Sequence, residues 1–187
     1  MSYLIINFDC SAGNGWNGQP IYRSGCGQED DKTFDMNQTL TDMKPGVYTI
    51  RCNAFYRIGD NDGGAAYKAG TEVIPTIFYA NNKSTKVKSL YSEEWQEAGE
   101  YSGMDNLNGY PHSMHAAALL FAEGRYENKI ELRLDAKSNI KIGLKCNENK
   151  RRSWCCFDNF SIEYKPLPQT TGIATAEKTI SNANVPL

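Results

Sequence analysis

The side chains best suited to acid–base chemistry gather in one segment, residues 91–108. Hydrolysis of a glycosidic bond needs two carboxyl groups held at a fixed separation of about 5–10 Å. The segment shows no hydrophobic periodicity, so it is predicted to be a long loop, which does not hold carboxylates at a fixed distance. We therefore expect a solvated loop, without a catalytic pair, for its glutamates Glu93, Glu94, Glu97 and Glu100.

Two histidines, His112 and His115, offer a second set of reactive groups. They lie at the start of a predicted helix, where one face of the helix could carry both. Because no third ligand stands at the spacing of a metal site, a capping or surface role is favoured. The sequence also lacks the Gly-x-Ser-x-Gly pattern of hydrolase nucleophiles and the Cys-x-x-Cys pattern of zinc sites. We expect a protein that is not an enzyme.

The chain has six cysteines, whose spacing defines no disulfide framework, although their number is compatible with an oxidising compartment. Three of them fall on the apolar phase of predicted strands. Because a free cysteine behaves as a small buried hydrophobe, we expect packed thiols at Cys52, Cys146 and Cys156.

Composition narrows the class of protein. The 187 residues are 40% hydrophobic and 22% charged, which is ordinary for a globular domain. A net charge of -2, with the densest basic cluster confined to Lys150–Arg152, argues against nucleic-acid binding. No apolar run approaches the roughly 20 residues of a membrane span. The first residues, MSYLIINFD, lack the features of a signal peptide.

Short stretches of alternating hydrophobicity dominate the chain. One helix of about ten residues is predicted between Ser113, a good N-cap, and Gly124, a good helix stop. This pattern favours an all-β fold, a two-sheet antiparallel jelly-roll sandwich with one short helix. The predicted strands are Tyr3–Phe8, Thr33–Leu40, Val47–Ile58, Pro75–Ala80, Lys86–Leu90, Lys129–Ala136, Asn139–Cys146 and Ser153–Tyr164.

The last of these strands carries an anomaly. A strict period of two places an apolar set on one face, and it places Asp158 on that same face. A buried carboxylate costs several kcal/mol unless it is paired or bound to a cation, so Asp158 needs a partner. The apolar set is Trp154, Cys156, Phe160, Ile162 and Tyr164.

Several of these elements resemble one known family. The closing Trp154-x-x-Phe157-Asp158-Asn159-Phe160 pattern, the opening Asn7-Phe8-Asp9 with Gly15-Trp16, and Tyr110-Pro111 before an Ala-rich helix are similar to galactose-binding-like jelly rolls. More narrowly, they resemble carbohydrate-binding-module-like domains of exported proteins from Bacteroides-type bacteria. The resemblance implies a non-catalytic module that binds a polysaccharide or oligosaccharide. It also implies a secreted or cell-surface location, periplasmic or outer-membrane-associated, with a leader already removed.

The same resemblance implies a structural calcium ion between the opening loop, the following strand and the last strand. Asp158 matches the closing carboxylate of the family, and Asp9 and Glu29 are expected to be the opening ones. Calcium takes six to eight oxygen ligands, so backbone carbonyls would complete the shell. The alternative is that Asp158 accepts hydrogen bonds from backbone N–H groups of the opening loop.

A sugar-binding surface usually stacks aromatic rings on pyranose faces and bonds the hydroxyl groups with polar side chains. The aromatic residues least explained by strand phase are Trp95, Tyr91 and Tyr101. We expect them to form a platform, assisted by Arg57 and Asn61. The alternative, left open, is that Trp95 is a lid folded onto the sandwich and that the protein is a structural or protein-interaction module without a sugar ligand.

The composition changes after Tyr164. Residues 165–187 contain three prolines and no sustained periodicity, and their ending resembles the lead-in to a C-terminal sorting domain. The expected organisation is therefore a jelly-roll domain at 1–164 and a linker at 165–187, with the sorting domain absent and neighbouring domains belonging to a longer chain.

Overall fold

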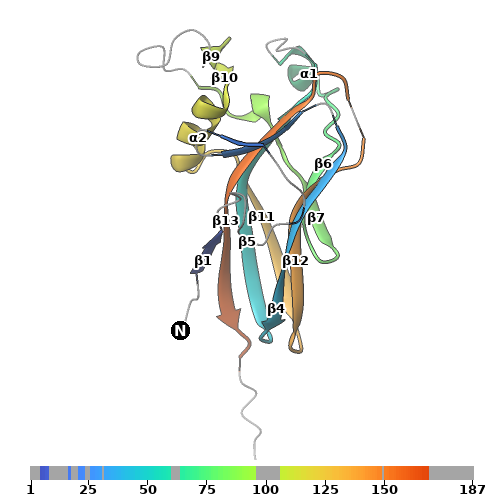
Figure 1. Cartoon of the computed structure of the whole chain (residues 1–187), viewed down its shortest axis with the longest axis vertical. Helices are drawn as coiled ribbons and strands as arrows, with labels where there is room; N and C mark the ends of the chain where they lie inside the picture. The colour runs from blue at the N-terminus through green and yellow to red at the C-terminus, as the bar shows by residue number, and fades with distance from the viewer. Residues whose placement is uncertain are drawn as a thin grey trace, which may run out of the picture.

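A computed structural model of the chain describes residues 5–8, 17, 21–23, 26–30, 32–59, 64–95, 106–148 and 150–168. Two β-sheets, antiparallel in all their long pairings, make up the body of the molecule (Figure 1). The expected all-β, two-sheet sandwich is confirmed. Among the described helices, none is long and apolar enough to cross a bilayer.

The larger sheet has seven strands in the order β11-β5-β13-β3-β2, with β1 beside β13 and β8 beside β5. Its long central strands, β5 and β13, are the ones the sequence pattern marked most clearly. The seven strands are β1 (Ile5–Phe8), β2 (Ile21–Arg23), β3 (Cys26–Asp30), β5 (Gly46–Arg57), β8 (Lys88–Ser89), β11 (Glu127–Leu134) and β13 (Trp154–Pro166).

The smaller sheet has four strands in the order β4-β12-β6-β7. A separate two-stranded hairpin and three helical segments complete the described chain. The strands of this sheet are β4 (Phe34–Met43), β6 (Thr76–Ala80), β7 (Lys83–Lys86) and β12 (Ser138–Cys146), the hairpin is β9 (Asn106–Leu107) with β10 (Tyr110–Pro111), and the helices are α1 (Ala65–Lys68), the 3-10 turn η1 (Leu90–Ser92) and α2 (Met114–Ala122).

The first hydrophobic core fills the space between the two sheets. The alternation of β5 is as expected, because every second side chain from Tyr48 to Tyr56 is buried there. Opposite them lie apolar side chains of β12 and β6, among them Ile142, Leu144 and Phe78. This core holds the two sheets together.

A second core lies on the outer face of the larger sheet, where α2 packs against β13 and β3. The helix starts and stops where the sequence predicts. Ser113 Oγ accepts a hydrogen bond from Ala116 N at 3.1 Å, and Gly124 takes a positive φ of 79° just after the end. Phe55 and Trp154 extend from the sheet beneath the helix, with their ring centroids 5.1 Å apart.

The expected single alternation of the last strand is wrong. The pairing of β13 with β5 shifts register between Asp158 and Ser161, and Asn159 there has a φ of 52°. Such a bulge inserts an extra residue and moves the following side chains to the other face. Phe160 and Ile162 therefore face the first core, whereas Trp154 and Cys156 belong to the second. The first half of β13 is buried on both faces.

The expected packed thiols are confirmed. Cys52, Cys146 and Cys156 are free and buried, and so are Cys26 and Cys155, for which the sequence made no prediction. Cys10 lies outside the described residues. β13 ends at Pro166, two residues into the segment assigned to the linker, and 169–187 also lie outside the described residues.

Candidate ligand-binding groove

Three side chains from different parts of the chain form one row across the larger sheet. Trp154 of β13 lies opposite Asp30 of β3 on one side and opposite Arg57 of β5 on the other. Because side chains alternate along a strand, all three belong to the face that carries α2. The row stands where β5 ends and β13 begins, away from the hairpin turns at the lower end of the sandwich (Figure 1).

Direct contacts hold this row in place. The guanidinium carbon of Arg57 lies 5.1 Å from the centre of the Trp154 ring, a cation–π distance. On the other side the indole Nε1 of Trp154 donates to Gln28 Oε1 at 3.0 Å. Gln28 Nε2 in turn donates to Asp30 Oδ2 at 3.0 Å. Each polar group is therefore oriented by its neighbour, on strands in the middle of a sheet.

The row forms part of a groove of about 410 Å³. The start of α2 and the turn before β13 also line it, and in that turn Arg152 adopts a left-handed φ of 59°. The volume falls in the usual range of about 300–1,000 Å³ for small-molecule sites. We call this space the groove; it is lined by Gln28, Asp30, Arg57, His112, Ser113, Met114, Arg152, Ser153 and Trp154.

The groove combines several kinds of polar group. Arg57 and Arg152 bring positive charges, and Asp30 brings a negative one. Burial and the nearby charge of Arg57 both lower the pKa of His112 below its usual value of 6.5, so the ring is neutral near pH 7. Such a set can bond hydroxyl groups and oxyanions.

The expected aromatic platform is not exposed. Trp95 is only 3% exposed and Tyr91 5%, and both belong to the second core. Tyr91 packs its ring against Tyr110 with the centroids 5.0 Å apart, and Trp95 N donates to Gly109 O at 2.6 Å. Neither ring offers an open face to a sugar, so the structure supports the alternative of a lid folded onto the sandwich.

The other three residues of the predicted ligand site are Tyr101, Asn61 and Arg57. Tyr101 and Asn61 lie outside the described residues. Arg57 lines the groove. Of the predicted ligand residues that the structure describes, Arg57 alone reaches this site.

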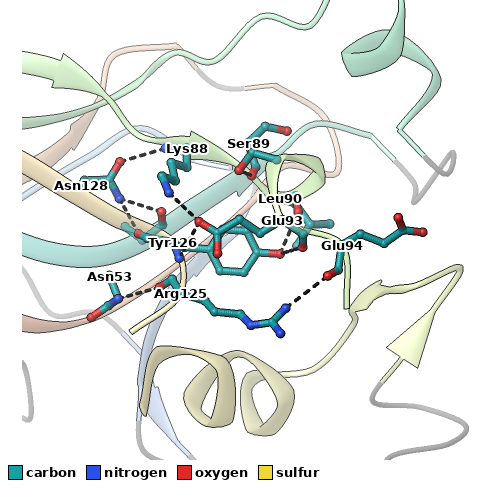
Figure 2. A network of polar contacts seen from close by, with 11 residues as sticks. Asn53, Lys88, Ser89, Leu90, Glu93, Glu94, Arg125, Tyr126 and Asn128 are labelled. Carbon is teal, nitrogen blue, oxygen red and sulfur yellow. Dashed lines mark hydrogen bonds and ion pairs between the residues drawn. The ribbon is translucent and has the colours of Figure 1, made fainter. Parts of the chain in front are cut away.

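A polar network anchors the lid to the sheet (Figure 2). The buried Tyr126 hydroxyl lies 2.9 Å from Leu90 O and 2.7 Å from Glu93 O. Glu93 Oε1 accepts a hydrogen bond from Tyr126 N at 3.0 Å and also contacts Lys88 Nζ. Glu93, one of the glutamates weighed for acid–base chemistry, therefore has a structural role.

Asn128 ties the same network to β5. Its Nδ2 lies 2.8 Å from Ala54 O and 2.9 Å from Tyr126 O, and its Oδ1 accepts from Lys88 N at 2.9 Å (Figure 2). Because a buried backbone group without a partner costs free energy, these bonds allow the irregular segment after β8 to lie against the sheet.

Two of the carboxylates expected to share a calcium ion, Glu29 and Asp158, are not brought together. Glu29 lies opposite Cys155, and Asp158 is three residues further along β13, so the two side chains point to opposite faces of the sheet. Glu29 instead pairs with Lys32 Nζ at 2.6 Å, and burial raises its pKa. Asp158 is 9% exposed, and Asp9 lies outside the described residues. Within the described ranges, no three acidic, histidine or cysteine side chains gather as a metal site.

The groove also contains residues that sequence reasoning missed. Trp154 was assigned to the core, and Gln28, Asp30 and Arg152 were not considered as site residues. His112 was considered, with a capping or surface role favoured. Comparisons of the chain with protein-family models, with curated proteins and with solved structures found no match.

Proposed function

We propose that this protein is a non-catalytic carbohydrate-binding module and that an oligosaccharide or a segment of polysaccharide occupies the groove. The observation that carries the proposal is the row of Asp30, Trp154 and Arg57, oriented by contacts and lining a space of about 410 Å³. Sugar hydroxyls are both donors and acceptors, so they suit a site that offers guanidinium, amide and carboxylate groups side by side.

The rigidity of the support favours specific binding. Arg57 and Trp154 stand on two neighbouring central strands, β5 and β13, and side chains on strands are positioned more accurately than those on loops. Little conformational entropy is then lost when a ligand binds, which favours affinity.

The test is a calorimetric titration with a panel of plant and mucin oligosaccharides, using the wild type and two arginine variants. Arg57→Gln should weaken binding about tenfold or more, because a charge-assisted hydrogen bond contributes about 1.5–3 kcal/mol. Arg51→Gln is the matched control. It lies on the same strand and face but about 20 Å away, where Arg51 pairs with Glu127 and Glu163.

The second candidate is a structural or protein-interaction module without a sugar ligand. The burial of Trp95 and Tyr91 favours it, because these rings serve packing and not binding. If the folded protein gives no heat of binding with any saccharide of the panel, this second candidate is the better one.

Export to the periplasm or cell surface and attachment to neighbouring domains are parts of the same proposal, and they rest on the sequence resemblance. A structural calcium ion is a further part, in which Asp158 and Asp9 would supply carboxylates. If so, a chelator lowers the melting temperature of the wild type and leaves that of Asp158→Asn unchanged. Glu29→Gln should keep the response to the chelator, because Glu29 faces the other side of the sheet.

A further inference from the structure

The ionised side chains of the groove differ in sign from the chain as a whole. The chain carries a formal net charge of -2. Among the described residues that line the groove, Arg57 and Arg152 carry two positive charges and Asp30 carries one negative charge. Arginine stays protonated at every pH at which proteins are folded, so this local excess is permanent.

The carboxylate of Asp30 and the guanidinium group of Arg57 differ in how many of their hydrogen-bonding atoms already have a partner in the protein. Asp30 Oδ2 already accepts a hydrogen bond from Gln28 at 3.0 Å. Arg57 donates from Nη1 to Gly59 O at 2.9 Å, and its Nε has no acceptor among the described residues. Because a guanidinium group has five N–H donors, the protein leaves part of the donor capacity of Arg57 unused.

The surroundings of the groove add to the positive potential. Arg152 closes the turn Lys150–Arg152, in which Lys150 Nζ pairs with the carboxylate of Glu148 and Ser153 N donates to Lys150 O at 3.1 Å. The N-terminal end of α2, which is the positive end of the helix dipole, also lines the groove with Ser113 and Met114. Two guanidinium groups from separate elements therefore line one groove, and among the described residues that line it Asp30 is the one carboxylate.

We propose that the saccharide held in the groove is acidic, and that Arg57 and Arg152 bind its oxyanion. This inference rests on the proposed function and deepens it. A carboxylate of a uronic acid and a sulfate ester share the chemistry required, because both accept paired hydrogen bonds from the planar fork of a guanidinium group. Asp30 and Gln28, already joined by a hydrogen bond, line the same groove.

The test is a calorimetric titration of the full chain with three oligosaccharides of equal length. They are a neutral galacto-oligosaccharide, an oligogalacturonide and a sulfated galacto-oligosaccharide; sodium sulfate and a poly-glutamate peptide serve as anions without a sugar. We expect one of the acidic saccharides to bind at least tenfold tighter than the neutral one. We also expect this preference to shrink at 0.5 M salt, where the screening length is only a few Å.

Two variants test the assignment to the arginines. Arg57→Gln should reduce the preference for the acidic saccharide about tenfold, whereas Arg51→Gln should leave it unchanged. Arg152→Gly removes the second charge at a position with a φ of 59°, a conformation that suits glycine better than arginine. This variant should lose most of the preference, and a melting curve recorded beside that of the wild type separates weakened binding from unfolding.

The outcomes separate this inference from the proposed function. If the neutral saccharide binds in the groove as tightly as the acidic ones or more tightly, the inference of an acidic ligand is wrong. The proposal of a carbohydrate-binding module then still holds. Binding of none of the three saccharides would overturn both. Sulfate ion or poly-glutamate binding as tightly as the acidic saccharides would also overturn the inference, because the site would then recognise charge without a sugar.

Discussion

Arg57 covers the ring of Trp154, with 5.1 Å between its guanidinium carbon and the ring centre, and the two residues face each other across the ladder between β5 and β13. The contact explains why Trp154 is only 6% exposed although it lines the groove. Trp154 therefore acts as a support that orients Arg57 and Gln28, and the polar side chains around it are the groups that meet a ligand.

The hydroxyl group of Tyr126 holds the lid formed by Leu90–Trp95. In Tyr126→Phe the carbonyl groups of Leu90 and Glu93 lose a buried donor, so we expect the free energy of unfolding to fall by about 1–3 kcal/mol. Urea denaturation measures this change. Tyr164→Phe is the matched control, because its hydroxyl donates to Pro45 O at an exposed site and water replaces the lost bond. Equal effects of the two substitutions would contradict the account of the lid.

The cap of α2 also contributes to stability. Ser113→Ala removes the acceptor for Ala116 N and should lower the free energy of unfolding by about 1 kcal/mol. Ser113→Asp keeps an acceptor at the cap and should melt close to the wild type. If thermal melting shows the alanine variant to be as stable as the wild type, the cap is energetically unimportant.

The sequence alone predicts the sandwich and the short helix because these depend on local signals. The alternation of β5, the Ser113 cap and the Gly124 stop can each be read within a few residues. The bulge of β13 has only a weak signal, the tolerance of Asn159 for a positive φ, so the phase of Trp154 was predicted wrongly.

The groove depends on contacts between distant parts of the chain. Gln28 and Trp154 are 126 positions apart, and the hydrogen bond between them follows from the register of β3 against β13. No local pattern specifies which residues of two strands lie opposite each other at the end of a sheet. The role of the aromatic residues in the lid could not be predicted for a different reason. An aromatic residue outside the strand alternation is equally suited to packing and to ligand binding.

The buried cysteines should be unreactive in the folded protein. Burial raises the pKa of Cys155 and of Cys156 well above the usual value, so neither forms the reactive thiolate at neutral pH. We expect iodoacetamide to leave Cys26, Cys52, Cys146, Cys155 and Cys156 unlabelled until denaturant is added, as followed by peptide mass spectrometry. Rapid labelling of any of these five under native conditions would show that its surroundings open readily.

Binding of an acidic saccharide should strengthen as the pH falls from 8 to 6. The pKa of His112 is lowered by burial and by Arg57 in the free protein, and a bound anion favours the protonated ring. The other charged groups among the described lining of the groove are Arg57, Arg152 and Asp30. His112→Gln should flatten the pH profile of the dissociation constant. An unchanged slope in this variant would exclude His112 as the titrating group.

The same shift predicts a small effect on stability. Because the folded protein binds the His112 proton less tightly than the unfolded chain does, stability contributed by the neutral ring is lost as the pH falls below about 6.5. Chemical denaturation at pH 7.5 and pH 5.5 measures this loss, which should be smaller in His112→Gln. A loss of the same size in both proteins would assign the pH dependence to other groups.

The most direct test of the groove is an NMR titration that follows the indole N–H signals of the three tryptophans. Trp154 donates its indole N–H to Gln28 inside the groove, whereas Trp95 is buried in the lid. We expect the Trp154 signal to shift saturably with the saccharide that binds in calorimetry, while the Trp95 signal stays in place. If the Trp95 signal shifts while the Trp154 signal does not, the saccharide does not bind in the groove, and the binding site lies near the lid.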